Sequence, residues 1–174
     1  MAAASVGTTR VERWRTAVEQ QQGASEVAVT TRIGQAIMLL HGGDREEAGN
    51  RFRELWTQIG ENGDPVHRCT LAHYLADTQD DPGDELAWDL RALSAAETLT
   101  NGDRAPRESL AAVRGLYPAL HLSLAVDYLK LHHPQAARIH LERAREAVEV
   151  LADDGYGAGV RAEIDRLERR LAQE

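Results

Sequence analysis

The chain has few of the residues that mark several common classes of protein. Its 174 residues include a single cysteine, Cys69, so no disulfide can form within the chain, and one free thiol fits a reducing compartment. No apolar stretch approaches the roughly 20 residues that a helix needs to span a bilayer. The first residues lack the basic start and the apolar run of a secretory signal. These absences predict a soluble, cytoplasmic protein.

Positive charge is also scarce. The formal net charge is −8 with a pI near 5.4, and only one of the 20 basic residues, Lys130, is a lysine. Because an acidic chain repels phosphate backbones and anionic lipids, we expect neither nucleic acid nor a membrane as a partner. The preference for arginine, together with the many alanines, is typical of high-GC coding and favours a bacterial source.

Motifs that carry catalysis are missing. The chain has no Gly-x-Gly-x-x-Gly, no Walker loop, no His-Glu-x-x-His and no Gly-x-Ser-x-Gly. His132 and His133 are adjacent and cannot both point into one site, and no Cys, Asp or Glu joins them, His121 or His140 at the spacing of metal ligands. We predict a structural turn at His132-His133, no metal site, no cofactor and no enzymatic activity.

Two further features of the sequence, a lone cysteine and an acidic run, have structural explanations. Cys69 shares a helical face with apolar neighbours, which predicts a buried, unreactive thiol. An acidic run without basic residues lacks the Asp-x-Asp-x-Asp-Gly order of a calcium-binding loop, so we explain it by helix capping and a solvated turn. The run consists of Asp77, Asp80, Asp81, Asp84, Glu85 and Asp89.

Helical periodicity runs through the chain. Apolar residues recur every three or four positions, as in Val11, Trp14 and Val18, and no strand-like alternation exceeds a few residues, so we predict an all-α fold. Thr9 and Asp44 are predicted N-caps, and Asp64-Pro65 opens a further helix. We expect a disordered segment at 1–8 and a single domain at 9–174. It comprises an N-terminal helix at 9–22, helix pairs at 26–59, 65–99 and 118–151, a further helix at 107–116 and a capping helix at 157–172.

The segment from about Arg107 to Leu131 is longer than the neighbouring helical segments. Pro118 lies inside it and is expected to kink it or to split it in two. Its second part is apolar on two sides, through the rows Leu120, Leu124, Tyr128, Leu131 and Leu122, Val126, Leu129. A helix of this kind either lies between two layers or lines a groove.

The helices also repeat in pairs. Ala36, Leu39, Ala48 and Phe52 have the same internal spacing as Ala125, Tyr128, Ala137 and Leu141. Small residues at such points let two antiparallel helices approach closely. With these residues, the chain resembles the tetratricopeptide repeat family. It departs from the family pattern at His132-His133, which stands where a glycine turn is usual, and in the long interval between the second and third pairs.

The resemblance implies a short right-handed solenoid that binds a peptide or helix of a partner protein along its concave face. It places ten residues on that face: Ile37, Leu40, His41, Thr70, His73, Asp77, Leu122, Ser123, Val126 and Lys130. This row is more apolar than charged, which suits an amphipathic helix or a peptide with apolar anchors. Part of it is alternatively covered by the helix at 107–116 or by a second copy of the chain. The remaining alternatives are therefore a structural homo-oligomer, such as a homodimer, and a small helical enzyme or metal carrier that uses the histidines.

Overall fold

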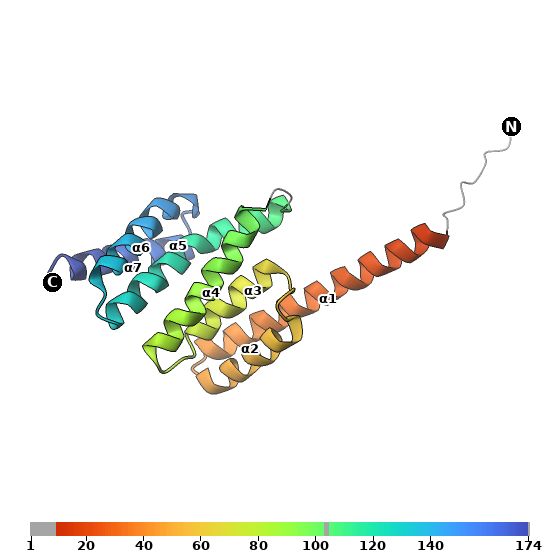
Figure 1. Cartoon of the computed structure of the whole chain (residues 1–174), viewed down its shortest axis with the longest axis horizontal. Helices are drawn as coiled ribbons and strands as arrows, with labels where there is room; N and C mark the ends of the chain where they lie inside the picture. Colours follow the sequence, from red (N-terminus) through yellow and green to blue (C-terminus); the bar gives the residue numbers. More distant parts are fainter. Residues whose placement is uncertain (1–9, 103–104, 174) are drawn as a thin grey trace.

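The described part of the chain is entirely helical. The computed structural model describes residues 10–102 and 105–173, and within them the predicted all-α fold is confirmed (Figure 1). The predicted disorder of residues 1–8 and the capping role of Thr9 lie outside the described residues. The elements are α1 (Arg10–His41), α2 (Arg45–Ile59), α3 (Pro65–Ala76), α4 (Pro82–Thr100), α5 (Arg107–Lys130), α6 (Pro134–Ala147), the 3-10 turn η1 (Val148–Val150) and α7 (Gly155–Leu171).

Aspartates set the beginnings of four helices. The carboxylates of Asp44, Asp64, Asp81 and Asp154 accept hydrogen bonds from backbone N–H groups in the first turns of α2, α3, α4 and α7. These bonds satisfy donors that have no partner inside the helix. The predicted caps at Asp44 and at Asp64 are confirmed, and Asp81 accounts for one member of the acidic run.

The helices follow one another across the molecule in chain order (Figure 1). Each packs against its neighbour in sequence, and α3 also contacts α1 and α5. Three apolar clusters result: one between α1, α2 and α3, one between α3, α4 and α5, and one between α5, α6, η1 and α7. Since α3 and α5 each belong to two clusters, they tie the layers together.

Helix α5 lies between two layers, as its two apolar rows predict. Val113 and Leu120 belong to the cluster with α3 and α4, whereas Ala125 and Leu129 belong to the cluster with α6 and α7. The segment is not split at Pro118, because α5 runs without interruption from Arg107 to Lys130. Proline costs the helix a hydrogen bond, and burial of the Pro118 ring contributes to offsetting that cost. The separate helix predicted at 107–116 is therefore the first part of α5.

Helix α1 also differs from the expected pair of helices. Residues 23–25, where we expected a break, are helical, and α1 is continuous over 32 residues. Gly23 costs a helix only about 1 kcal/mol relative to alanine, which does not end it without a proline or a cap. The first part of α1 extends away from the other helices and does not cap them (Figure 1).

The alanines that match between the pairs lie at the tightest contacts. Ala36, Ala48, Ala125 and Ala137 have no exposed surface. We predict that Ala125→Leu lowers the free energy of unfolding by about 1–3 kcal/mol, because a larger side chain must separate α5 from α6. Chemical denaturation measures the change, and Ala111→Leu, at an exposed position on the same helix, should leave stability within about 0.5 kcal/mol.

Candidate functional site

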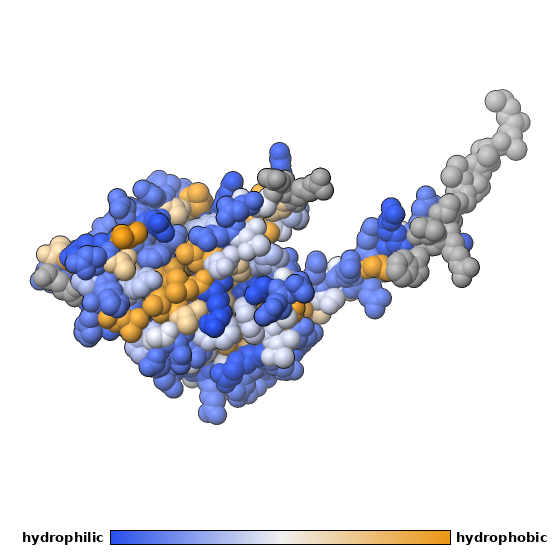
Figure 2. Space-filling view, viewed as in Figure 1, coloured by the Kyte–Doolittle hydropathy of each residue, from blue (hydrophilic) through white to orange (hydrophobic). Residues whose placement is uncertain are grey.

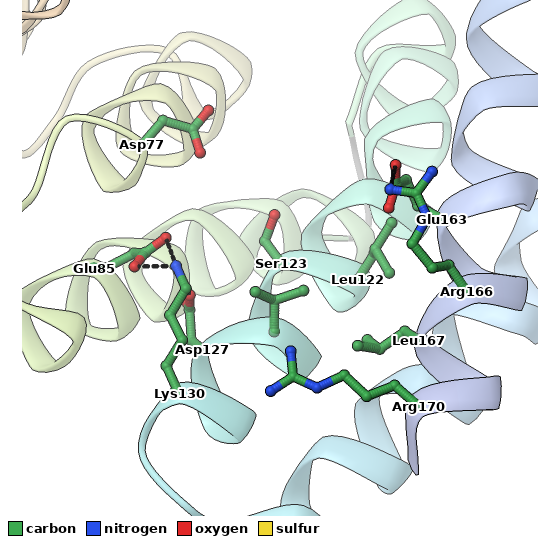
Figure 3. A pocket seen from close by; sticks show the side chains of 11 residues that line it. Asp77, Glu85, Leu122, Ser123, Asp127, Lys130, Glu163, Arg166, Leu167 and Arg170 are labelled. Atoms are coloured by element: carbon green, nitrogen blue, oxygen red, sulfur yellow. Dashed lines mark hydrogen bonds and ion pairs between the residues drawn. The ribbon is translucent and has the colours of Figure 1, made fainter. Parts of the chain in front are cut away.

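A pocket of about 470 Å³ opens between the end of α3, the start of α4, the second half of α5, and α7. Figure 3 shows carboxylates of α3 and α4 on one side and the side chains of α7 on the other, with α5 between them. Eleven residues line it, and together they define the α5 groove: Asp77, Glu85, Leu122, Ser123, Val126, Asp127, Lys130, Glu163, Arg166, Leu167 and Arg170.

The floor of the α5 groove is apolar. Leu122 and Val126 are half-buried on α5 and pack against the cluster that α5 forms with α6 and α7, to which the buried Leu167 belongs. In Figure 2 apolar side chains gather along the course that α5 takes in Figure 1, and hydrophilic side chains surround them. An exposed apolar strip with a polar rim is the usual composition of a protein-binding surface.

One end of the groove carries most of its acidic groups. Lys130 Nζ donates to both oxygens of Glu85, at 2.7 and 2.6 Å, and so joins α5 to α4. The same Nζ lies 4.0 Å from Asp127 Oδ1. Asp77 is exposed at the end of α3 and points toward this group (Figure 3). With one lysine and the carboxylates of Asp77 and Glu85, this end has a net negative charge and attracts positively charged groups.

Beneath this end lies a buried network of hydrogen-bonded polar side chains. Asp127 is only 1% exposed, and a hydrogen bond joins its carboxyl group to that of Asp89, which is 2% exposed. His73 Nδ1 donates to Asp89 Oδ1 at 3.1 Å. This network therefore links α3, α4 and α5 through side chains that are almost inaccessible to water.

Asp127 holds the proton that its bond to Asp89 requires. Ionised carboxylates only accept hydrogen bonds, so one of the two must be protonated. Burial, followed by the charges of Asp89 and Glu85, raises the pKa of Asp127 to about 8. The second oxygen of Asp127, Oδ2, is buried and has no hydrogen-bond partner among the described residues. At neutral pH the raised pKa favours the protonated form of Asp127, whose hydroxyl donates to Asp89.

Asp89 and His73 form a hydrogen-bonded pair in this network, and each changes the pKa of the other. Burial raises the pKa of Asp89, although the hydrogen bond from His73 opposes the shift. Burial alone would lower the pKa of His73, but the bond to Asp89 and the charges of Asp89 and Asp77 outweigh it, so the pKa is raised. The hydrogen bond between His73 and Asp89 joins α3 to α4, and it favours the charged form of each partner.

The opposite end of the groove is formed by α7. Arg166 is largely exposed and pairs with Glu163 at 2.9 Å. The side chain of Arg170 extends from α7 across the groove toward α5 (Figure 3). Helix α7 therefore contributes two guanidinium groups and one carboxylate to the groove. The groove thus offers an acidic end, an apolar floor and a basic end within one pocket.

Five of the ten residues predicted for the concave face line this groove: Asp77, Leu122, Ser123, Val126 and Lys130. The other five lie elsewhere. Ile37 and Leu40 pack against the cluster of α1, α2 and α3, and His41 is exposed at the end of α1. The hydroxyl of Thr70 donates to the backbone oxygen of Val66, and His73 is engaged with Asp89. That the groove residues bind a partner stays a prediction.

The other histidines and the cysteine have structural surroundings. His132 adopts a left-handed backbone with φ of 62° at the turn between α5 and α6, the conformation that glycine usually supplies. His121 and His140 face each other with their Nδ1 atoms 3.0 Å apart, and burial lowers the pKa of His121 to about 4. Cys69 is buried, and this raises the pKa of its thiol to about 12. The described residues contain no group of three metal-ligating side chains.

Comparison of the chain with protein-family models, with curated proteins and with solved structures finds no match. The resemblance to the tetratricopeptide repeat therefore stays a prediction. By length and composition alone, α5 meets the criterion for a membrane-crossing helix, contrary to our expectation that no stretch does. A third of its apolar window is buried, and residues of α5 belong to the clusters with α3 and α4 and with α6 and α7.

Proposed function

We propose that the chain is a non-enzymatic protein-binding module, an adaptor or regulator, that holds a helix or peptide of a partner protein in the α5 groove. The observation that carries this proposal is the composition of the groove, in which Leu122, Val126 and Leu167 lie between an acidic and a basic end. An amphipathic segment buries its apolar side on such a floor, and the charged ends fix its direction and register.

We further propose that the helices form a short array of the tetratricopeptide type, with α1–α2, α3–α4 and α5–α6 as the pairs and α7 as the cap. Short turns connect the helices of each pair, and contacts link α1 to α3 and α3 to α5. The fully buried alanines of the first and third pairs support the same arrangement. In an array of this kind the first helices of the pairs face the partner, as α5 does in the groove.

The test of this function is partner capture with Val126→Asp. The substitution places a charge on the apolar floor, so retention of the partner should fall at least tenfold, equivalent to about 1.4 kcal/mol. Affinity capture from the native cell extract, read by mass spectrometry, compares the wild-type chain with the variant. Ala111→Asp adds the same charge to an exposed position of α5 outside the groove and should retain the partner.

Val126 also packs against the core, so a second variant separates binding from folding. Arg166 is exposed, so its substitution removes no contact with the core. Arg166→Glu reverses the charge at the basic end, and it should weaken the same partner while circular dichroism and the unfolding midpoint stay at wild-type values. Equal retention of the partner by both groove variants and by Ala111→Asp would place binding outside the α5 groove.

A further inference from the structure

The acidic end of the α5 groove holds one carboxylate more than it holds cations. Lys130 is engaged with Glu85, because its Nζ donates to both carboxylate oxygens at 2.7 and 2.6 Å. His73 is engaged with Asp89, to which its Nδ1 donates at 3.1 Å. Among the described residues, none forms a hydrogen bond or an ion pair with the carboxylate of Asp77, which lines the groove. Asp77 is therefore the member of this group that lacks a positive partner of its own.

The surroundings of Asp77 favour an added positive group. Partial burial in the groove raises the pKa of Asp77, and although the charge of His73 opposes this rise, the charges of Asp89 and Glu85 add to it. Asp77 is also the C-cap of α3, and the carboxyl end of a helix carries a partial negative charge. A cation bound at this point is therefore stabilised both by a carboxylate and by a helix end.

The apolar floor begins one helical turn from this end of the groove. Val126 and Leu122 lie four and eight residues before Lys130 on α5, which places them about 6 and 12 Å along the helix axis from it. Both are half-buried, and they line the groove together with Leu167 of α7. An occupant that uses the whole of this surface therefore carries a cation at one end and apolar groups over the next two turns.

Cations of other kinds use only part of this surface. A metal ion requires several ligands, and the described residues contain no group of three metal-ligating side chains. A small amine pairs with Asp77 but leaves the floor formed by Leu122 and Val126 uncovered. A basic side chain on an amphipathic helix satisfies both parts of the surface, because residues four apart lie on the same side of a helix.

We infer that the occupant of the α5 groove is a helix of a partner protein that carries a lysine or arginine one turn from the first of two apolar residues, themselves one turn apart. The basic side chain donates to the carboxylate of Asp77 and supplies the missing positive charge. The apolar side chains lie on Val126 and Leu122. This inference rests on the proposed function of the groove and adds the chemistry by which the groove selects its partner.

Fluorescence anisotropy with labelled synthetic peptides tests this selection. Each probe is a helix of alanine and glutamine with two leucines one turn apart and a lysine one turn from the nearer leucine, made with the lysine before the leucines and after them. A matched probe carries norleucine, which has a similar length and no charge, in place of the lysine. The better of the two lysine probes should bind the full chain about tenfold or more tightly than its match, which lacks the charge-assisted hydrogen bond to Asp77.

Three controls assign the preference for lysine to Asp77. Asp77→Asn should abolish this preference and leave the affinity for the norleucine probe unchanged. Asp84→Asn removes the same charge from an exposed position outside the groove and should keep the preference. A probe with its lysine moved to the side opposite the leucines should bind no better than the norleucine probe. This last control separates the site from the general attraction of a cation to a chain of net charge −8.

Equal binding of the lysine and norleucine probes overturns the inference, and a loss of both with Val126→Asp would then leave the proposed function standing. A lysine preference that persists in Asp77→Asn, or in the probe with the moved lysine, also overturns it. Absence of binding by every probe does so as well, while partner capture still decides the proposed function separately.

Discussion

Asp127→Asn should stabilise the chain, and the gain should grow with pH. Above about pH 8 the wild-type chain carries an ionised Asp127 that is buried beside Asp89. Lys130 compensates this charge only in part, and because an uncompensated buried charge costs about 3 kcal/mol or more, we expect the variant to gain up to about 3 kcal/mol of unfolding free energy there. Below the ordinary aspartate pKa of 3.8, where Asp127 is protonated whether folded or unfolded, the gain should nearly vanish.

The direction follows from the two pKa values of Asp127. Its pKa is 3.8 in the ordinary state and about 8 in the folded chain, so between these values the folded chain holds the proton and the unfolded chain releases it. Stability from this group is complete below 3.8 and is lost as the pH rises to about 8. Asparagine does not titrate, and its amide still donates a hydrogen bond to Asp89, so the variant lacks this loss.

Denaturant unfolding at a series of pH values measures the effect. Asp84→Asn removes one negative charge from an exposed position on α4 and serves as the control. Its profile should run parallel to that of the wild type. If the profile of Asp127→Asn were also parallel, with a constant offset, Asp127 would not hold a proton in the folded chain.

The sequence predicts most helices well because their signals are local. Asp44 and Asp64-Pro65 mark the starts of α2 and α3 within one turn of chain, and the apolar period marks the buried side. Two of the wrong expectations concern helix breaks, at Gly23 and at Pro118. Gly23 and Pro118 each weaken a helix locally, but a weak point does not by itself end a helix. At Pro118 the outcome depends on burial against other segments, and at Gly23 the residues nearby do not form a turn that would end the helix.

The groove is predictable only in part, for a related reason. Its α5 residues share one side of a single helix, so their spacing alone places Leu122, Ser123, Val126 and Lys130 together. Arg166 and Arg170 reach the same pocket only because α7 folds back beside α5, which no local pattern encodes. The sequence does contain a signal for Asp127. A carboxyl group within the apolar run from Leu120 to Leu131 indicates that the group either has a polar partner or is protonated.

The loss of His73 should be among the most damaging single changes in the chain. His73 supplies the positive partner of Asp89, which is 2% exposed, and their atoms are 3.1 Å apart. Leucine at this position keeps the volume but leaves the carboxylate without its cation. Removal of one member of a buried pair costs about 3–5 kcal/mol, so we expect His73→Leu to lower the unfolding free energy by that amount at neutral pH.

Two companion variants separate the charge of His73 from its packing. His73→Gln retains a donor for Asp89 without the charge, so its loss should be intermediate. Asp89→Asn in the His73→Leu background removes the orphaned charge and should recover more than half of the loss, because a buried pair is replaceable by neutral groups whereas half a pair is not. Urea unfolding of the four chains measures these differences. Should Asp89→Asn deepen the loss of His73→Leu, then the stability of this region rests on the shape of the imidazole ring and not on its charge.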